Sequence, residues 1–100
     1  MFIIKANIQF IDKYRQSAIR GNTYRPLLYF DNYVIRSGLI FIDNNELLHM
    51  DKSYNNRLIG IYFYKDLDYI NIFKVGETFE IKEGTVLIGF GEITEVIGEA

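Results

Sequence analysis

The stretch FEIKEGTVLIGFGEITEV, residues 79–96, decides the fold that the sequence predicts. It reads as two β-strands around a turn at Glu83 and Gly84. Because side chains alternate across a strand, Gly89 and Gly91 leave one face bare while Ile88 and Phe90 fill the other. Glycines inside a strand mark a bend or the close approach of another backbone. We therefore predict a bent hairpin that helps to close a small barrel.

The rest of the chain predicts further strands. β-Branched and aromatic residues, or a strict apolar–polar alternation, mark residues 2–10, 23–30, 34–42 and 57–64, with a short strand or an extended segment over 67–73. Residues 12–22 break the pattern, and we interpret them as a long basic loop, with one helical turn over residues 14–20 as the alternative. Turn-forming residues recur about every ten residues, as in the polar turns predicted over 43–46 and 51–56, without any helical period. The prediction is one all-β domain over 1–100, a small closed antiparallel β-barrel of about six or seven strands.

The composition limits the classes of protein to consider. Hydrophobic residues make up 49% of the chain, enough for a core, and there is no cysteine for disulfide, metal or redox chemistry. No apolar run approaches the roughly 20 residues of a membrane span, and the first residues turn polar too early for a signal peptide. We expect a cytoplasmic protein with no metal, no cofactor, no bound nucleotide and no membrane contact.

The net charge of −2 hides an asymmetry between the two ends of the chain. Residues 1–36 carry six basic and two acidic side chains, a net +4, whereas residues 37–100 carry five basic and eleven acidic ones, a net −6. Such an imbalance predicts a basic face for an acidic partner if the halves stay apart. It predicts no such face if the barrel mixes both halves on one surface.

Four segments of the chain carry a family resemblance. Residues 24–30, YRPLLYF, are similar to a Tyr-Arg-Pro-x-Phe-Tyr-Phe signature, and residues 37–40, SGLI, to the Thr-Gly-Thr-Ile that follows it. Residues 79–96 resemble a closing Phe-x-Ile-Arg-Glu-Gly segment with a Val-Gly-x-Gly-Val-Val strand, and residues 6–11 match a first strand in pattern only. Together they resemble, in order and spacing, the third, C-terminal β-barrel domain of elongation factor Tu-like translational GTPases.

The resemblance implies a docking module without GTPase activity. In that family the third barrel contacts the T-stem of aminoacyl-tRNA, the nucleotide-exchange factor and the GTPase domain, and this chain has no P-loop. Ser37, Glu83 and Gly84 fall where the family contacts the tRNA stem, but Leu27 replaces its glutamine and Asp31 its arginine. Losing a donor and inverting a charge both oppose phosphate contact. The family's Gly-Arg-His-Thr-Pro loop and Met-Pro-Gly-Asp turn are also missing.

The candidate binding residues, for a partner protein or RNA, are Lys13, Arg15, Arg20, Tyr24, Arg25, Ser37, Glu83 and Gly84. Those of the first loop surround Tyr14, and cations mixed with an aromatic ring suit a nucleic-acid backbone or an acidic protein surface. A solvated loop explains them equally well.

Arg25 beside Tyr24 has two interpretations. Its guanidinium can bind a phosphate or a carboxylate through bidentate hydrogen bonds. Alternatively, its stem packs on the barrel and its head pairs with an acidic neighbour such as Glu83.

No motif predicts an enzyme. His49 is the only histidine, and Asp51 and Ser53 nearby do not preset a catalytic triad. The two glycines of the last strand lack the third glycine and the helix that dinucleotide binding requires. The glutamates within residues 77–95 fit a solvated strand face, with paired acid–base catalysis as the alternative.

The sequence thus predicts a non-catalytic module, monomeric or a weak homodimer, that docks on a protein partner in a mimic, accessory or immunity-type role. The alternative is an RNA- or tRNA-stem-binding module that uses the basic N-terminal loop.

Overall fold

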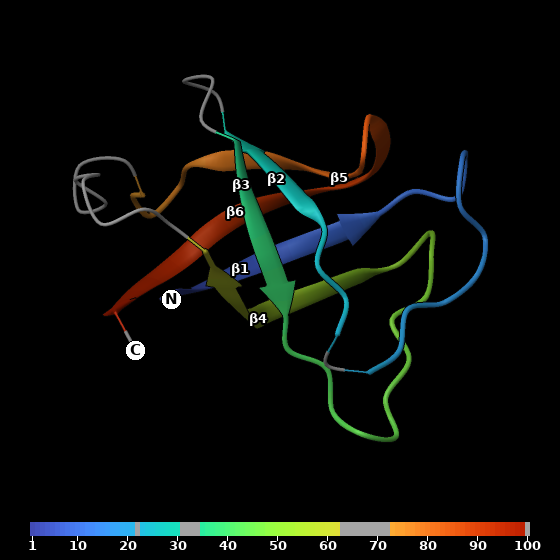
Figure 1. Ribbon diagram of the computed structural model, residues 1–100, viewed down its shortest axis with the longest axis horizontal. Helices are drawn as coiled ribbons and strands as arrows, with labels where there is room; N and C mark the ends of the chain where they lie inside the picture. Colours follow the sequence, from blue (N-terminus) through green and yellow to red (C-terminus); the bar gives the residue numbers. More distant parts are fainter. Residues whose placement is uncertain (22, 31–34, 63–72, 100) are drawn as a thin grey trace.

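Six antiparallel strands close into a barrel (Figure 1). The computed structural model describes residues 1–21, 23–30, 35–62 and 73–99. The strands are β1 (Phe2–Phe10), β2 (Leu27–Phe30), β3 (Ile35–Ile40), β4 (Ser53–Ile61), β5 (Thr78–Glu83) and β6 (Val86–Glu99). Their order is β1-β4-β3-β2-β5-β6, and β1 also pairs with β6, which closes the sheet. The predicted all-β class and the small closed antiparallel barrel are confirmed.

Strand β1 follows the predicted alternation along its whole length. Every second side chain is buried, namely Phe2, Ile4, Ala6, Ile8 and Phe10. These residues point into the barrel because side chains alternate across a strand. They meet apolar side chains from the other five strands, and no polar or charged residue is buried as a whole in the described part of the chain. The polar chemistry of these residues therefore lies on the outer surface and the loops.

A bulge in β6 overturns one detail of the prediction. Ile81 of β5 lies opposite Gly89, but the next β5 residue lies opposite Leu87, so Ile88 is an extra residue in the ladder. An extra residue reverses the alternation on one side of a bulge. Ile88 is consequently buried, whereas Phe90 is 44% exposed. The prediction that these two side chains share a face was wrong.

Gly89 and Gly91 of β6 lie where another part of the chain comes close, as predicted. A Cβ added to Gly89 would lie 2.6 Å from the carbonyl oxygen of Gln9 in β1, which is a backbone atom. A Cβ added to Gly91 would overlap the ring of Phe79 inside the barrel. Both positions thus exclude a side chain for steric reasons.

Strand β4 begins earlier than the sequence predicts. We expected residues 51–56 to form a turn, but Ser53 and Tyr54 already pair with β1. The ladder then shifts at Asn55 and Asn56, where Asn56 adopts a φ of +53° and its N–H donates to Asn7 Oδ1 at 3.0 Å. Asparagine tolerates this left-handed conformation, so a polar run that resembles a turn forms a bulged strand.

Other predicted bounds were too wide or fall outside the described residues. Strand β2 starts at Leu27 rather than at 23. The predicted strands over 34–42 and 57–64 each include residues outside the described ranges. The predicted segment 67–73 lies outside them except for its last residue.

The basic loop after β1 has no regular helix or strand in its described residues, as expected. One point of it is fixed, because Ile19 and Leu48 exchange two backbone hydrogen bonds of 2.9 Å and both side chains are buried. The loop therefore runs beside the connection between β3 and β4 at one end of the barrel (Figure 1).

Candidate functional site

Arg15, Tyr24 and Glu83 come together from three distant parts of the sequence. The Arg15 guanidinium forms an ion pair with the Glu83 carboxylate, and it lies 5.5 Å from the centre of the Tyr24 ring. Its other nitrogens donate to the carbonyl oxygens of Ser17, at 2.9 Å, and Ala18, at 3.4 Å. The basic loop is thereby tied to the β5–β6 hairpin. Three of the predicted binding residues form one cluster, which we call the Arg15–Tyr24–Glu83 cluster.

Tyr24 stays neutral in this cluster. Burial raises the pKa of its phenol well above the ordinary value, the negative charge of Glu83 raises it further, and Arg15 opposes the rise. The hydroxyl is buried and makes no hydrogen bond of normal geometry in the described part of the chain, although the Glu83 carboxylate is close enough to act on it. A buried hydroxyl in this state costs stability.

The turn between β5 and β6 positions Glu83. Glu83 pairs with Val86, so only Gly84 and Thr85 connect the strands. Gly84 has a φ of +62°, in the left-handed region that glycine adopts at little cost. Because a residue with a side chain is strained in this conformation, a glycine is favoured at this position of the turn. Gly84, one of the predicted binding residues, therefore has a role in shaping the turn.

Arg25 and Ser37 meet at Tyr62. The Arg25 guanidinium lies 5.1 Å from the centre of the Tyr62 ring, and the Tyr62 N–H donates to the Ser37 carbonyl oxygen at 2.9 Å. Glu83 pairs with Arg15 rather than with Arg25, so the proposed Arg25–Glu83 pair is replaced by a cation–aromatic contact. Sequence reasoning missed Tyr62.

The outer face of β3, β2 and β5 connects these groups. Leu27 lies opposite Ser37 on one side and opposite Lys82 on the other. The Lys82 ammonium lies 4.3 Å from the centre of the Tyr29 ring and 3.8 Å from the nearer carboxylate oxygen of Glu80. Alternation alone places Lys82 and Tyr29 on the outside, but only the strand register shows that they touch. We call this surface, together with the Arg15–Tyr24–Glu83 cluster and Arg25, the arginine–tyrosine face.

Lys13 and Arg20 form no hydrogen bond or ion pair with that face in the described part of the chain. Both are exposed, and the Lys13 ammonium lies 5.1 Å from the Tyr14 ring of the same loop. Within the described residues, no ion pair or hydrogen bond joins either one to the cluster. The structure therefore brings together Arg15, Tyr24 and Glu83, and leaves the other two loop cations to solvent.

The charge asymmetry of the sequence is partly cancelled by folding. Arg15 pairs with Glu83, and Lys5 lies 4.0 Å from Glu95, so each pair joins a base from the first third to an acid near the end. At these two positions the barrel brings the two halves of the chain together on one surface.

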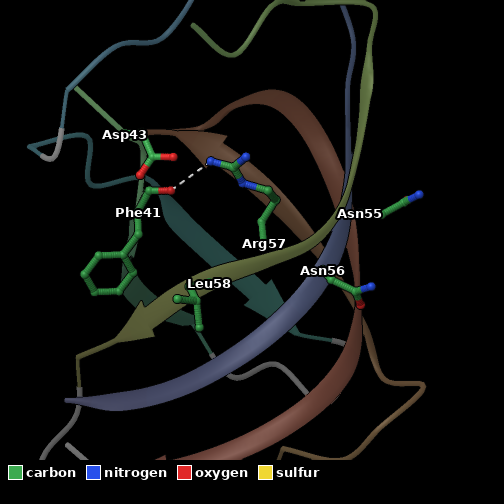
Figure 2. Close-up of a pocket in the computed structure, with 6 residues that line it drawn as sticks. All are labelled: Phe41, Asp43, Asn55, Asn56, Arg57 and Leu58. Atoms are coloured by element: carbon green, nitrogen blue, oxygen red, sulfur yellow. Dashed lines mark hydrogen bonds between the residues drawn. The ribbon is translucent and has the colours of Figure 1, made fainter. Parts of the chain in front are cut away.

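A second polar site, which the sequence did not predict, lies beside β4 (Figure 2). Two adjoining hollows of about 270 and 440 Å³ share Phe41, Asp43 and Leu58 in their walls. Arg57 extends into the smaller one and grips Glu46, which is 11 residues away in the sequence. No pattern in the sequence predicts this pair, because the glutamate lies in a turn and the arginine in a strand.

Comparisons with known proteins leave the family open. No model of a known protein family matches the chain, and a search of curated proteins gave no match. In the described residues there is no group of three or more His, Cys, Asp or Glu side chains placed to hold a metal ion. The same residues include no helix long and apolar enough to cross a membrane.

Proposed function

We propose that this barrel is a non-catalytic docking module that binds a protein partner through the arginine–tyrosine face. The resemblance to the third domain of elongation factor Tu supports a docking role, of the mimic, accessory or immunity type. Most interface energy comes from a few residues, among which arginine and tyrosine are enriched. This face presents both residue types in contact with one another.

Two arginine–aromatic contacts on one face, Arg15 with Tyr24 and Arg25 with Tyr62, are the observation that carries the proposal. Arg15 is held by Glu83 and by two carbonyl groups, and Arg25 lies over Tyr62. Side chains that are already ordered lose little conformational entropy when a partner binds, about 0.5–1.5 kcal/mol less for each one. A partner of mixed polarity, with carboxylates for Arg25 and apolar groups for Leu27 and Tyr29, suits this face.

The charges of the face favour a protein over RNA. Glu83 neutralises Arg15, and Glu80 lies beside Lys82, so two of its cations already have an acidic neighbour. Affinity for RNA depends first on uncompensated positive charge that displaces counterions. One observation supports RNA as the second candidate, namely that Lys13 and Arg20 are exposed loop cations without an ion pair in the described residues.

The test compares capture of a partner by matched variants. The immobilised domain is incubated with extract of its native host, and the captured protein is then titrated with the purified domain by calorimetry. Arg25→Ala removes an exposed cation of the face, and Lys74→Ala removes an equal charge from the turn before β5. We expect a stoichiometric protein whose affinity falls at least about tenfold with Arg25→Ala, as for a hot-spot residue, and stays unchanged with Lys74→Ala. Failure to capture any stoichiometric protein refutes the proposal.

The RNA candidate has its own test. Fluorescence anisotropy of a labelled tRNA is followed between 50 and 200 mM salt, a range over which real phosphate contacts weaken binding steeply. Lys13→Ala with Arg20→Ala then flattens the salt dependence if the loop binds RNA. Absence of binding at the lowest salt concentration eliminates this candidate.

A further inference from the structure

The two hollows beside β4 form a groove with an apolar wall and an acidic end. Their shared residues are Phe41 and Asp43, which follow β3, and Leu58 of β4, which is 40% exposed. Phe41 itself is half-buried. Figure 2 shows Asp43 near the upper end of the site, with the Phe41 ring and Leu58 below it. We call this feature the β4 groove.

Arg57 is already committed to protein groups. Its Nη1 donates to Glu46 Oε2 at 2.7 Å, and its Nη2 donates to Glu46 Oε1 and, at 3.1 Å, to the Phe41 carbonyl oxygen. These bonds hold the pKa of Glu46 below its ordinary value, so the carboxylate stays ionised and cancels the charge of the arginine. Arg57 therefore does not attract an anion into the groove.

Asp43 supplies the excess charge of the groove. Its backbone N–H donates to Glu46 Oε1 at 3.3 Å, and its carbonyl oxygen accepts the N–H of Glu46 at 3.0 Å, so its backbone is fixed by the turn. Its carboxylate is exposed and makes no hydrogen bond and no ion pair within 4 Å in the described part of the chain. The negative charge of Asp43 also helps Glu46 to raise the pKa of Arg57, so two carboxylates face one arginine and one net negative charge remains.

The β4 side of the groove is held in place by its bulge. Asn56 adopts a left-handed conformation and is fixed by Asn7 of β1. Bulges are common next to binding sites, where they redirect side chains. Here Asn55 and Asn56 line the smaller hollow, and their side chains point away from Arg57 (Figure 2).

We propose that the β4 groove binds a lysine or arginine side chain from an extended segment of a partner protein. The charged head pairs with Asp43, and the alkyl stem lies along Phe41 and Leu58. Long basic side chains bury their stems on apolar surface in this way, and the face of an aromatic ring attracts a cation. The inference extends the proposed function, because it specifies what the partner presents at a second surface.

The first experiment uses a small probe and the intact chain. The ¹⁵N-labelled protein is titrated with acetyl-Leu-Lys-Leu-amide and, separately, with the same peptide carrying norleucine in place of lysine, which keeps the stem and removes the charge. We expect chemical-shift changes confined to residues 41–46 and 55–58, with about two- to fivefold weaker binding of the norleucine peptide, the size of one exposed ion pair. Shift changes elsewhere only, or equal binding of both peptides, overturn the proposal.

A matched pair of variants separates the groove from general electrostatics. Asp43→Asn removes the carboxylate of the groove, whereas Asp12→Asn removes an equal charge from the exposed loop after β1. Asp43→Asn lowers the affinity for the lysine peptide to that of the norleucine peptide, and Asp12→Asn leaves it unchanged. Equal losses in both variants refute a specific site. The titration needs no partner and does not involve Arg25, so its failure leaves the proposed docking function standing, and the reverse also holds.

Discussion

Replacing Gly91 by alanine tests the packing that closes the barrel. The added Cβ would overlap the ring of Phe79, which is buried and lies 5.2 Å, centre to centre, from the ring of Phe30. The ring cannot move outward, because it lies inside a closed sheet. It has to shift into neighbouring aromatic side chains of a filled core.

The expected cost follows from two opposing terms. Without a clash, alanine in place of glycine inside a strand is favourable by about 0.5–1 kcal/mol, because the unfolded chain loses freedom. Forcing one methyl group into a filled core costs about 1–3 kcal/mol. The clash is with ring atoms that cannot rotate away, so we take the upper end and expect Gly91→Ala to lower the free energy of unfolding by about 2 kcal/mol.

The assay is urea unfolding followed by circular dichroism, with a double-mutant cycle as control. Phe79→Leu alone removes ring volume and is destabilising by about 1–2 kcal/mol. In the double variant, the smaller side chain makes room for the methyl group, so the combined loss is smaller than the sum by at least about 1 kcal/mol. A neutral Gly91→Ala variant, or losses that simply add, would show that Phe79 does not occupy the space over Gly91.

Three further predictions concern single residues of the two sites. The folded-state pKa of Glu46 lies below its ordinary value of 4.5, so the stability gained from its pair with Arg57 is present above about pH 4.5 and is lost as the pH falls through the folded pKa. Glu46→Gln therefore lowers the free energy of unfolding at pH 7. In parallel urea titrations, the difference in the free energy of unfolding between this variant and the native chain is smaller at pH 3. Tyr24→Phe removes a buried hydroxyl without a hydrogen bond, so the free energy of unfolding, measured by urea denaturation, stays the same or rises by up to about 1 kcal/mol. A loss of more than about 1 kcal/mol would reveal a bond to Glu83. Gly84→Ala strains a left-handed turn residue with open space around it, and thermal unfolding should show a loss of about 1–2 kcal/mol; no loss would mean that the turn adopts another conformation.

Features that depend on one segment alone were predictable from the sequence. The alternation of β1 and the turn at Gly84 follow from properties of consecutive residues, and both are confirmed. The close approach at Gly89 was predictable for a related reason, because two glycines in one strand signal missing side-chain space. The closed barrel follows from several such local patterns that agree with one another.

Features that depend on the register between two strands were not predictable. The bulge at Ile88 reverses which of its neighbours face the core, and the bulge at Asn56 converts a polar run into a strand. Neither leaves a composition signal, because a bulge exists only relative to the opposite strand. The pairing of Arg57 with Glu46 depends on the same geometry, since the register of β3 and β4 brings the turn that carries the glutamate to the arginine.

The contrast between Arg15 and Asp43 explains why counting charges along the chain misleads about function. Arg15 belongs to the basic N-terminal part, yet its charge is cancelled by Glu83, which is 68 positions away. Asp43 is one acid among eleven in residues 37–100, yet at the groove it shares Arg57 with Glu46, so two carboxylates face one arginine and one negative charge remains. A partner responds to the charge that remains after such pairing. For this barrel, the acidic contact proposed at the β4 groove therefore depends on a local excess of carboxylates over arginines, and the overall excess of acids along the chain does not determine it.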